Sequence, residues 1–357
     1  MSGDIITVHP VRGGFSPLDE QLELKAGGWS EGVLREMVWL SGKMTYADAT
    51  EVLNRLGQVA VSQGSVRRGV IKWGEQMQQV EQANQEKGNA LPERGRVVRG
   101  EAGKSGRLGG AMDGAQVHLK DEGWKELKVG AVFELGTALV YDKDSGEMVP
   151  NGRAINNSYV AHLGGPDVFG QKMWAEAKRR DWSQYYETQI VGDGAPWIWR
   201  LTALHFFDST QTLDWSHAVG YLHQAADLLY PGDDNRRKTW FNKAETALFQ
   251  GHAHRLAQAL RHRAKTKKGD AAKTLRTIAN YLQTHQRRTQ YLEFREEGYL
   301  LGSGVVESEA KQYKARFTGS GMRWSRRGIE ALLPIRTAIM SQQFDQMWDA
   351  AFNLPPN

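Results

Sequence analysis

The segment VGDGAPWIW, Val191–Trp199, places an acidic side chain directly after a stretch with the character of a buried strand. Its lead-in, Thr188 to Val191, is β-branched and apolar, which favours a strand in a core. The carboxylate of Asp193 then stands between two glycines, ahead of a proline and two tryptophans. Gly-Asp-Gly is good turn chemistry, so a turn explains the segment by itself. A functional interpretation requires other carboxylates, at strand ends or helix starts, that converge on Asp193.

The elements predicted around this segment follow one order along the chain. Turn signals at Gly136 and at Asp144-Ser145-Gly146 separate the early strands. The predicted elements are strands at 109–119, 124–136 and 137–149, a loop and then a helix within 159–182, a strand from 186, a helix over 199–207 and a short strand over 210–214. Three antiparallel strands, a helix, a strand, a helix and a fifth strand is the order of the ribonuclease H-like fold, which belongs to the α/β class.

Two further carboxylates converge on Asp193 if the chain follows that fold. Asp113 would lie midway along the first strand and Asp193 just past the end of the adjacent fourth strand, so both would point into one shallow site. Glu307 follows a glycine-rich turn, near the start of a basic helix, and provides the third acid. Three carboxylates from separate elements are what two divalent cations about 4 Å apart require. The sequence therefore predicts two Mg²⁺ or Mn²⁺ ions held by these three acids.

Composition restricts the class of protein and of metal site. With 357 residues and 40% hydrophobic content, the chain is long enough for two or three domains with a buried core. It has no apolar run of about eighteen residues, and its start, MSGDIITVHPVRGG, lacks the features of a signal peptide. We therefore expect no membrane association and a cytoplasmic, nucleoid-associated protein. The absence of cysteine excludes disulfides and thiolate metal sites, which favours a hard cation on oxygen or imidazole ligands.

Positive charge is concentrated in two tracts of the second half of the chain. From Arg255 to Arg288 there are ten Lys or Arg against one acid, and from Lys311 to Arg336 there are seven against one. Basic tracts are often solvated helix faces, but two of them around an acidic centre favour a polyanionic partner, with nucleic acid as the first candidate. The candidate DNA contacts in these tracts are Lys265, Lys267, Lys268, Lys314, Arg316, Arg323, Arg326 and Arg327.

Three short helices are predicted in the first 74 residues, over 31–40, 45–56 and 62–73. Thr45 and Ser62 are the predicted N-caps of the second and third helices, and Gly57 and Gly74 are the predicted stops. These two helices have the spacing of a helix-turn-helix, although a generic helical packing unit explains the pattern equally. The residues that the third helix would present to DNA are Gln63, Arg67 and Arg68.

The composition also suggests where the domains divide. The segment EQMQQVEQANQEKGNALPERGRVVRGEAGKSG could extend the third helix at first, and after Pro92 it has the composition of a linker. The stretch between Asp214 and Glu307 reads as nearly all helical, which indicates a helical insertion in the catalytic domain. The predicted parts are an N-terminal helical module over 1–90, a linker over 91–107, a catalytic domain over 108–216 and 301–345, and the insertion over 217–300.

Several motifs together resemble those of a known enzyme family. The motifs are AMDGA, GWKELKVGAVFE, SYVAHLGGPDVFG, VGDGAPWIW, DWSHA and above all LGSGVVESEAKQYKARFTGSGMRWSRRGIEALLPIR. They are similar to those of the DDE transposases of bacterial insertion sequences of the ISKra type, distant relatives of the Mutator-like transposases of eukaryotes. The resemblance extends from FSPLDEQL, near residue 15, to the C-terminus. Relatives commonly carry a cysteine-rich segment before the helix-turn-helix, and this chain has no cysteine.

The resemblance implies roles for particular residues and a reaction. Asp113, Asp193 and Glu307 match the family's catalytic acids, and Asp214 and His217 of DWSH resemble an accessory pair. A structural histidine at the end of the fifth strand is the alternative for His217. The implied activity is that of a DNA transposase, which cleaves strands at insertion-sequence ends with divalent metal and then transfers the freed ends to target DNA.

The implied partners are double-stranded DNA, as element ends and as target, and further copies of the chain. Pairing two ends usually requires a dimer or a larger assembly, so we expect a homo-oligomer. Two alternatives stay open at the level of sequence. One is a ribonuclease H-like nuclease without strand transfer, and the other is a domesticated or truncated DNA-binding protein that keeps the fold without the reaction.

Overall fold

The computed structural model describes residues 6–7, 14–15, 29–90, 104–142, 146–319 and 321–354. Their contacts group into two compact units, and each unit is described by itself. Unit 1 contains the described residues of Met1–Ala83, His118–Gly123 and Ala315–Asn357, and unit 2 contains those of Asn84–Val117 and Trp124–Lys314. Within the described part of the chain, no helix is both long and apolar enough to cross a lipid bilayer.

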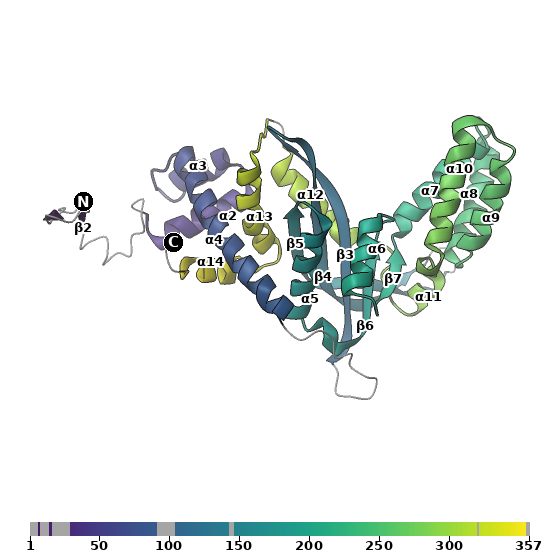
Figure 1. Cartoon of the computed structure of the whole chain (residues 1–357), viewed down its shortest axis with the longest axis horizontal. Coiled ribbons are helices and arrows are strands. Elements are labelled where there is room, and N and C mark those ends of the chain that lie inside the picture. Colours follow the sequence, from purple (N-terminus) through teal and green to yellow (C-terminus); the bar gives the residue numbers. More distant parts are fainter. Residues whose placement is uncertain are drawn as a thin grey trace. The chain divides into compact units, whose positions relative to one another are not determined.

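A five-stranded mixed sheet is the framework of unit 2 (Figure 1). Its strands are β3 (Lys104–Leu119), β4 (Gly123–Tyr141), β5 (Met148–Leu163), β6 (Tyr185–Gly192) and β7 (Thr210–Leu213). They lie in the order β5-β4-β3-β6-β7; β4 pairs antiparallel with β5, and β6 pairs parallel with both β3 and β7. The protein is therefore of the α/β class, and the predicted order of five strands and two intervening helices is confirmed.

The prediction that a turn at Gly136 ends the second strand is wrong. β4 runs through this position as far as Tyr141, and Gly136 pairs with Arg153 of β5 in the part of the antiparallel ladder that follows a register shift between Val132 and Glu134. One long strand, β4, therefore contains most of the segments 124–136 and 137–149, which were predicted as two strands. The third strand of the sheet is β5, and its last residues were predicted as a loop. Gly136 remains in the strand because its backbone groups are paired on the ladder, which outweighs the weak preference of glycine for turns.

Helices α5 (Pro166–Arg179) and α6 (Pro196–His205) alternate with the last three strands, as predicted. A proline occupies the first turn of each helix, where its missing N–H leaves no hydrogen bond unmade. The α6 helix starts three residues before its predicted position because Pro196 begins it. A short 3-10 turn, η1 (Trp182–Gln184), leads from α5 into β6.

The chain between β7 and the helix that carries Glu307 contains only helices. They are α7 (Trp215–Leu229), α8 (Asp234–Phe249), α9 (Ala253–Ala264), α10 (Gly269–Thr284), η2 (Gln286–Arg288) and α11 (Tyr291–Glu296). Helices α8, α9 and α10 lie side by side in Figure 1. One apolar core joins them to the sheet, since Met112 and Ile198 belong to the same buried cluster as Leu222 and Leu275. Burial of each such side chain stabilises the unit by about 1.5–3 kcal/mol.

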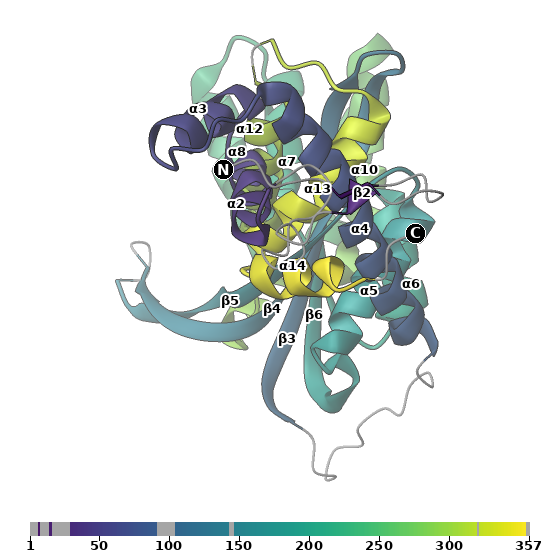
Figure 2. The same cartoon turned by 90° about the vertical axis from the view of Figure 1, so that its left-hand side faces the viewer.

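Unit 1 is built from both ends of the chain. Its helices are α2 (Glu31–Lys43), α3 (Tyr46–Arg55), most of α4 (Gln63–Ala90), the end of α12 (Gly304–Phe317), α13 (Arg326–Met340) and α14 (Phe344–Phe352). Figure 2 shows α13 and α14, in yellow, among the purple and blue helices α2 and α4. The indole rings of Trp73 and Trp348 are 4.8 Å apart, so the early and late helices share one core. The short strands β1 (Ile6–Thr7) and β2 (Gly14–Phe15) pair antiparallel.

Both predicted N-caps in this unit are confirmed. The Thr45 hydroxyl accepts a hydrogen bond from the backbone N–H of Asp48 at 3.1 Å. The Ser62 hydroxyl accepts one from the N–H of Ser65, also at 3.1 Å. Each cap satisfies a backbone N–H that the first helical turn leaves without a partner, so the two caps fix where α3 and α4 start.

The predicted end of the third helix at Gly74 is wrong, and the alternative that the following segment extends this helix is confirmed, because α4 continues to Ala90. The glycine is explained by packing. A Cβ at position 74 would lie 1.9 Å from the carbonyl oxygen of Ala331 in α13, so only a residue without a side chain lets the two helices come this close. In this helix the close approach to α13 outweighs the cost of about 1 kcal/mol for glycine in a helix interior.

We expect Gly74→Ala to destabilise the protein, because the added methyl group requires α13 to move. Overpacking of this kind costs about 1–3 kcal/mol. Gly32→Ala is the matched control: Gly32 is also helical, and its Cβ would meet nothing within 4 Å. This change should stabilise the protein by about 0.5–1 kcal/mol through helix propensity. Urea unfolding of both variants measures the difference, and equal effects at the two positions would contradict the packing explanation.

Candidate functional site

Two of the predicted acids lie at adjacent positions on neighbouring parallel strands. Asp113 lies within β3, and Asp193 directly follows the last residue of β6. Met112 is the register partner of Gly192, so each acid is one residue beyond this matched pair. Neighbouring strands are about 4.8 Å apart, which brings residues 80 positions apart in sequence to one edge of the sheet.

Each of these carboxylates makes one hydrogen bond to a nearby backbone amide. The Oδ1 of Asp113 accepts from the N–H of Gly114 at 2.6 Å, and the Oδ1 of Asp193 accepts from the N–H of Ala195 at 2.8 Å. No described side chain donates a hydrogen bond to either acid. The bond to Ala195 is the turn interaction expected of Asp193, so the turn is present and the other carboxylate oxygen is left for a ligand.

The glycines on either side of Asp193 are explained by close contacts. Neither has a positive φ, so turn geometry does not require them. A Cβ at Gly194 would lie 2.0 Å from the ring of Tyr281 in α10, and one at Gly192 would lie 2.8 Å from the side chain of Ile198. The ring of Tyr281 is thereby held next to the turn that carries Asp193.

Asp214 is the most extensively hydrogen-bonded acid of the site. Its side chain is 1% exposed and caps α7: its Oδ1 accepts from the backbone N–H of His217 at 2.8 Å and lies 3.1 Å from the Nδ1 of that residue. Its Oδ2 accepts from the N–H and the hydroxyl of Ser303, at 2.6 and 2.7 Å. Burial alone would raise the pKa of Asp214, but these hydrogen bonds outweigh it and lower the pKa to about 2.

His217 is held in its charged form by the acids around it. The hydrogen bond with Asp214 raises the pKa of His217 to about 9 against the opposing effect of burial, and the charges of Asp214, Asp193 and Asp113 act in the same direction. Its side chain is still 44% exposed, so the imidazolium can reach a ligand in solvent. The sequence allowed either a structural or a functional role for His217. The contacts fit both roles, because the ring contacts Asp214 and the charges of Asp193 and Asp113 also act on it.

Glu307 comes to the same place from the first turn of α12. Its backbone N–H donates to the carbonyl oxygen of Ser303 at 3.0 Å, and Ser303 is itself bound to Asp214. Ligand atoms of Asp214, His217 and Glu307 lie within 4.8 Å of one another, so the described residues contain a carboxylate and histidine group that could hold a metal ion.

The charges of the acids act on one another across the site. Burial raises the pKa of Asp113, and the charges of Asp193 and Glu307 raise it further, while its hydrogen bond to Gly114 and the charge of His217 oppose the change. The charges of the three predicted catalytic acids and of the predicted accessory pair, Asp214 and His217, thus act on one another within unit 2. A concentration of negative charge with one compensating imidazolium is a favourable environment for a divalent cation.

Glu309 is a site residue that the sequence analysis missed. It is completely buried, and neither carboxylate oxygen has a hydrogen-bond partner among the described residues. Burial raises the pKa of Glu309 well above its ordinary value, and the charge of Asp113 adds to this effect. A sequence signal existed: Glu309 has helical spacing with Val306 and Tyr313, both fully buried, so it lies on the inward face of α12.

The predicted DNA contacts occupy different environments. Lys265 and Lys268 are exposed between α9 and α10, whereas the Nζ of Lys267 donates to the carbonyl oxygen of Leu229 at 3.0 Å. Lys314 is exposed on α12. Arg68 is also exposed and donates to the Ser65 hydroxyl.

Two arginines of the second basic tract are matched by acids within unit 1. Arg326 contacts Glu122 and Glu330, and Arg327 contacts Glu75 at 2.6 Å. Surface ion pairs of this kind contribute about 0–1 kcal/mol to stability, and they reduce the positive charge offered to a polyanion. The remaining candidates, Gln63, Arg67, Arg316 and Arg323, border one cavity of unit 1.

Comparison with known proteins gives a family without an assigned activity. The model of an uncharacterised protein family, UPF0236, matches residues 17–345, so the chain belongs to that family. No curated protein matched the chain.

We expect His217 to titrate near pH 9 in the metal-free protein, and Asp214→Asn to lower this midpoint towards 6.5 because it removes the paired charge. NMR of the imidazole protons measures both midpoints. Since the folded-state pKa of His217 is raised and that of Asp214 is lowered, the pair's contribution to the free energy of unfolding is complete between about pH 4 and 6.5. It is lost as the pH rises through about 9 or falls through about 2. The exposed His262 serves as control, and an unchanged His217 midpoint in the variant would contradict the assignment.

Proposed function

We propose that this UPF0236 protein is a DDE-type DNA transposase that cleaves DNA strands at the ends of an insertion sequence and transfers them to target DNA. One observation carries the proposal. Asp113, Asp193 and Glu307, from two neighbouring strands and a helix start, act on one another beside a charged histidine, and no described side chain donates a hydrogen bond to the first two. Carboxylates gathered in this way are costly to a fold unless a ligand uses them.

The arrangement of the sheet supports the assignment of a ribonuclease H-like catalytic domain. Three sequential strands lie on one side, and β6 and β7 extend the sheet in parallel, each preceded by a helix. The acids follow the pairing of β3 with β6, where the sequence resemblance expects them. The helices α3 and α4, with their caps, support a helix-turn-helix module as the proposed DNA-reading part.

Asp113, Asp193 and Glu307 are the proposed ligands of two Mg²⁺ or Mn²⁺ ions. Asp214 is a poorer ligand, because both of its oxygens already accept hydrogen bonds, and a protonated His217 has no lone pair for a metal. When bound, the two ions would activate the attacking oxygen and stabilise charge on the leaving oxygen. Oxygen-only ligands suit such hard cations.

The remaining residues of the site would position the reacting groups. Asp214 holds His217 in place through two contacts, so the imidazolium can bind a phosphate oxygen of the DNA strand at the rim of the site. Tyr281 packs against Gly194 and limits movement of the turn that carries Asp193. The exposed Lys265 and Lys268 would contact the DNA backbone, and self-association would bring two element ends together.

We expect Asp193→Asn to fold and to bind DNA but to cleave it at least a hundredfold more slowly in Mg²⁺, because removal of one charge weakens cation binding at the shared site. Asp113→Asn and Glu307→Gln should behave alike, and a double variant should be little worse than each single one. The measurement is nicking of linear DNA that contains the sequences flanking the gene.

Asp208→Asn is the matched control, since Asp208 is an exposed acid of the same unit. It should cleave like the wild type. Near wild-type cleavage by Asp193→Asn would overturn the shared-site proposal. Cleavage by the wild type without joining of the freed 3′ ends to a second DNA would favour a nuclease, and binding without cleavage would favour a DNA-binding protein.

A further inference from the structure

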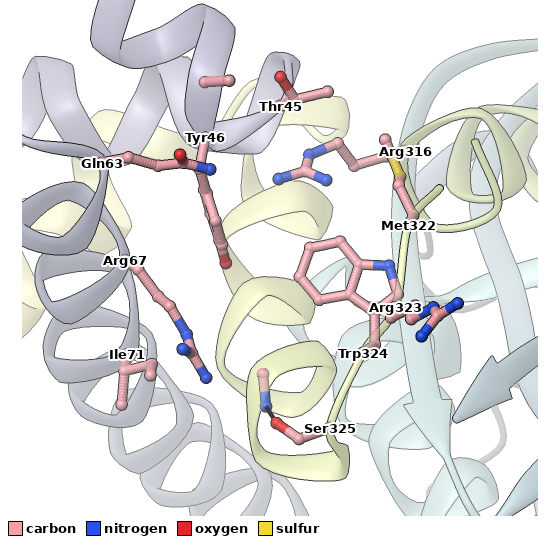
Figure 3. Close-up of a pocket in the computed structure, with 12 residues that line it drawn as sticks. Thr45, Tyr46, Gln63, Arg67, Ile71, Arg316, Met322, Arg323, Trp324 and Ser325 are labelled. Atoms are coloured by element: carbon pink, nitrogen blue, oxygen red, sulfur yellow. Dashed lines mark hydrogen bonds between the residues drawn. The ribbon is translucent and has the colours of Figure 1, made fainter. Parts of the chain in front are cut away.

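A cavity of about 360 Å³ lies within unit 1, the unit that does not contain the acidic site. Its walls come from the start of α3, the first turns of α4 and the segment between α12 and α13 (Figure 3). The side chains that decide its chemistry are Tyr46, Gln63, Arg67, Arg316, Arg323 and Trp324. The cavity is therefore lined by cationic and aromatic groups drawn from distant parts of the sequence.

Arg316 is a buried cation with an unused donor. Its side chain is 3% exposed, its Nε donates to the carbonyl oxygen of Ser41 at 2.9 Å, and its Nη2 is buried without a hydrogen-bond partner. The guanidinium lies over the rings of Trp324 and Tyr46, at 5.1 and 5.4 Å from their centres. Burial lowers the pKa of Arg316 to about 10, so the group is still charged at neutral pH. A buried N–H of a charged group requires an acceptor, and the cavity can admit one.

Arg67 brings a second positive charge to the same space. In Figure 3 the side chain of Arg67 extends from α4 into the space below the hydroxyl of Tyr46, and Arg316 lies on the other side of that ring. Tyr46, Arg67 and Arg316 line the same cavity, and both positive charges oppose the rise in the pKa of Tyr46 that burial causes. Arg67 has no hydrogen-bond or ion-pair partner among the described residues, in contrast to Arg326 and Arg327, which contact acids.

One acid opposes this positive charge. The carboxylate of Asp48 acts on Arg316 but accepts a hydrogen bond from the Thr45 hydroxyl at 2.8 Å, so it is held at the start of α3. Arg323 also borders the cavity, and Figure 3 shows its guanidinium directed away from Arg67. The described residues that line the cavity include Arg67 and Arg316 but no acidic side chain, which favours an anionic occupant.

We propose that this cavity binds a phosphate group of the DNA backbone, with Arg67 and Arg316 as its cationic donors. Two guanidinium groups match the several oxygens of a phosphate, and the Tyr46 hydroxyl and the Gln63 amide can add further donors. The cavity is larger than a phosphate group, which leaves room for the attached sugar and for a base against the aromatic rings. Because a phosphate contact fixes position without reading sequence, Arg67 would orient the proposed helix-turn-helix on DNA.

The inference rests on the proposed DNA partner, and inorganic phosphate is the first probe. Calorimetric titration of the full-length protein, at constant ionic strength set with chloride, should detect phosphate binding. Arg67→Gln should weaken it at least tenfold. Arg55→Gln is the matched control, because Arg55 is an exposed arginine of the same unit that pairs with Glu51 and lies outside the cavity; this variant should change the affinity less than twofold.

Competition then identifies the source of the phosphate. Phosphate should raise the apparent Kd of the wild type for duplex DNA beyond the effect of matched chloride, and this extra effect should disappear in Arg67→Gln. Phosphate binding without competition would mean that the cavity serves a small phosphorylated molecule and would overturn the DNA assignment. Absence of phosphate binding by the wild type, or equal binding by Arg67→Gln, would overturn the site itself.

The test separates this inference from the proposed reaction. The competition should be the same in Asp193→Asn, because the acidic site takes no part in it. A protein that fails to cleave DNA yet keeps the competition would lose the transposase assignment and retain the phosphate site. A protein that cleaves DNA but has no competition would retain the reaction and lose the phosphate site.

Discussion

The hydrogen bonds of Asp214 hold the candidate site together. This buried carboxylate follows β7, begins α7 and accepts two hydrogen bonds from Ser303 immediately before α12. Its own backbone N–H donates to the carbonyl oxygen of Gly192, the last residue of β6. An unpaired charge at such a position would cost several kcal/mol, and these donors offset that cost only while the segments keep their places. The hydrogen bonds of Asp214 therefore fix the positions of His217 and Glu307 next to Asp193.

The other acids of the site accept few hydrogen bonds, in contrast to Asp214. Asp113 and Asp193 each use one oxygen on a neighbouring amide, and buried Glu309 has no hydrogen-bond partner among the described residues. Among the described residues, the imidazolium of His217 opposes the negative charges of Asp113 and Asp193. A fold under selection for stability alone would replace such groups by apolar ones of similar size. Their presence within β3, directly after β6 and on α12 is the physical basis of the proposed metal site.

Unit 1 presents the opposite electrostatic situation. Arg316 is buried with an unused donor beside Tyr46 and Trp324, and Arg67 faces the same space. Stacking against aromatic rings lowers the cost of burying a guanidinium but does not replace a missing acceptor. An acidic site that needs cations and a basic cavity that needs an anion are both consistent with a protein whose ligand is a nucleic acid strand with bound metal ions.

Local chemistry in the sequence was sufficient for the class of fold, the strand order and many element starts. Thr45 and Ser62 were predicted as helix starts from residues within three positions of each. Pro166 and Pro196 begin helices for equally local reasons, although the second of these helices was predicted to start at residue 199. The candidate acids Asp113, Asp193 and Glu307 could also be named in advance, because they follow recognisable strand and turn patterns. Their common location depended on the assumed fold, and their proposed roles depended on a family resemblance.

Only tertiary structure decided why particular glycines are required and which arginines form ion pairs. Gly74 and Gly194 read as a helix stop and a turn, but each is required where Ala331 or Tyr281 comes within reach of its Cα. Basic residues that look alike in the sequence divide into ion-paired Arg326, buried Arg316 and Arg67, which has no ion-pair partner among the described residues. The reason is physical: helix starts and strand patterns arise from neighbours along the chain, whereas close contacts and unsatisfied charges depend on segments that meet only after folding.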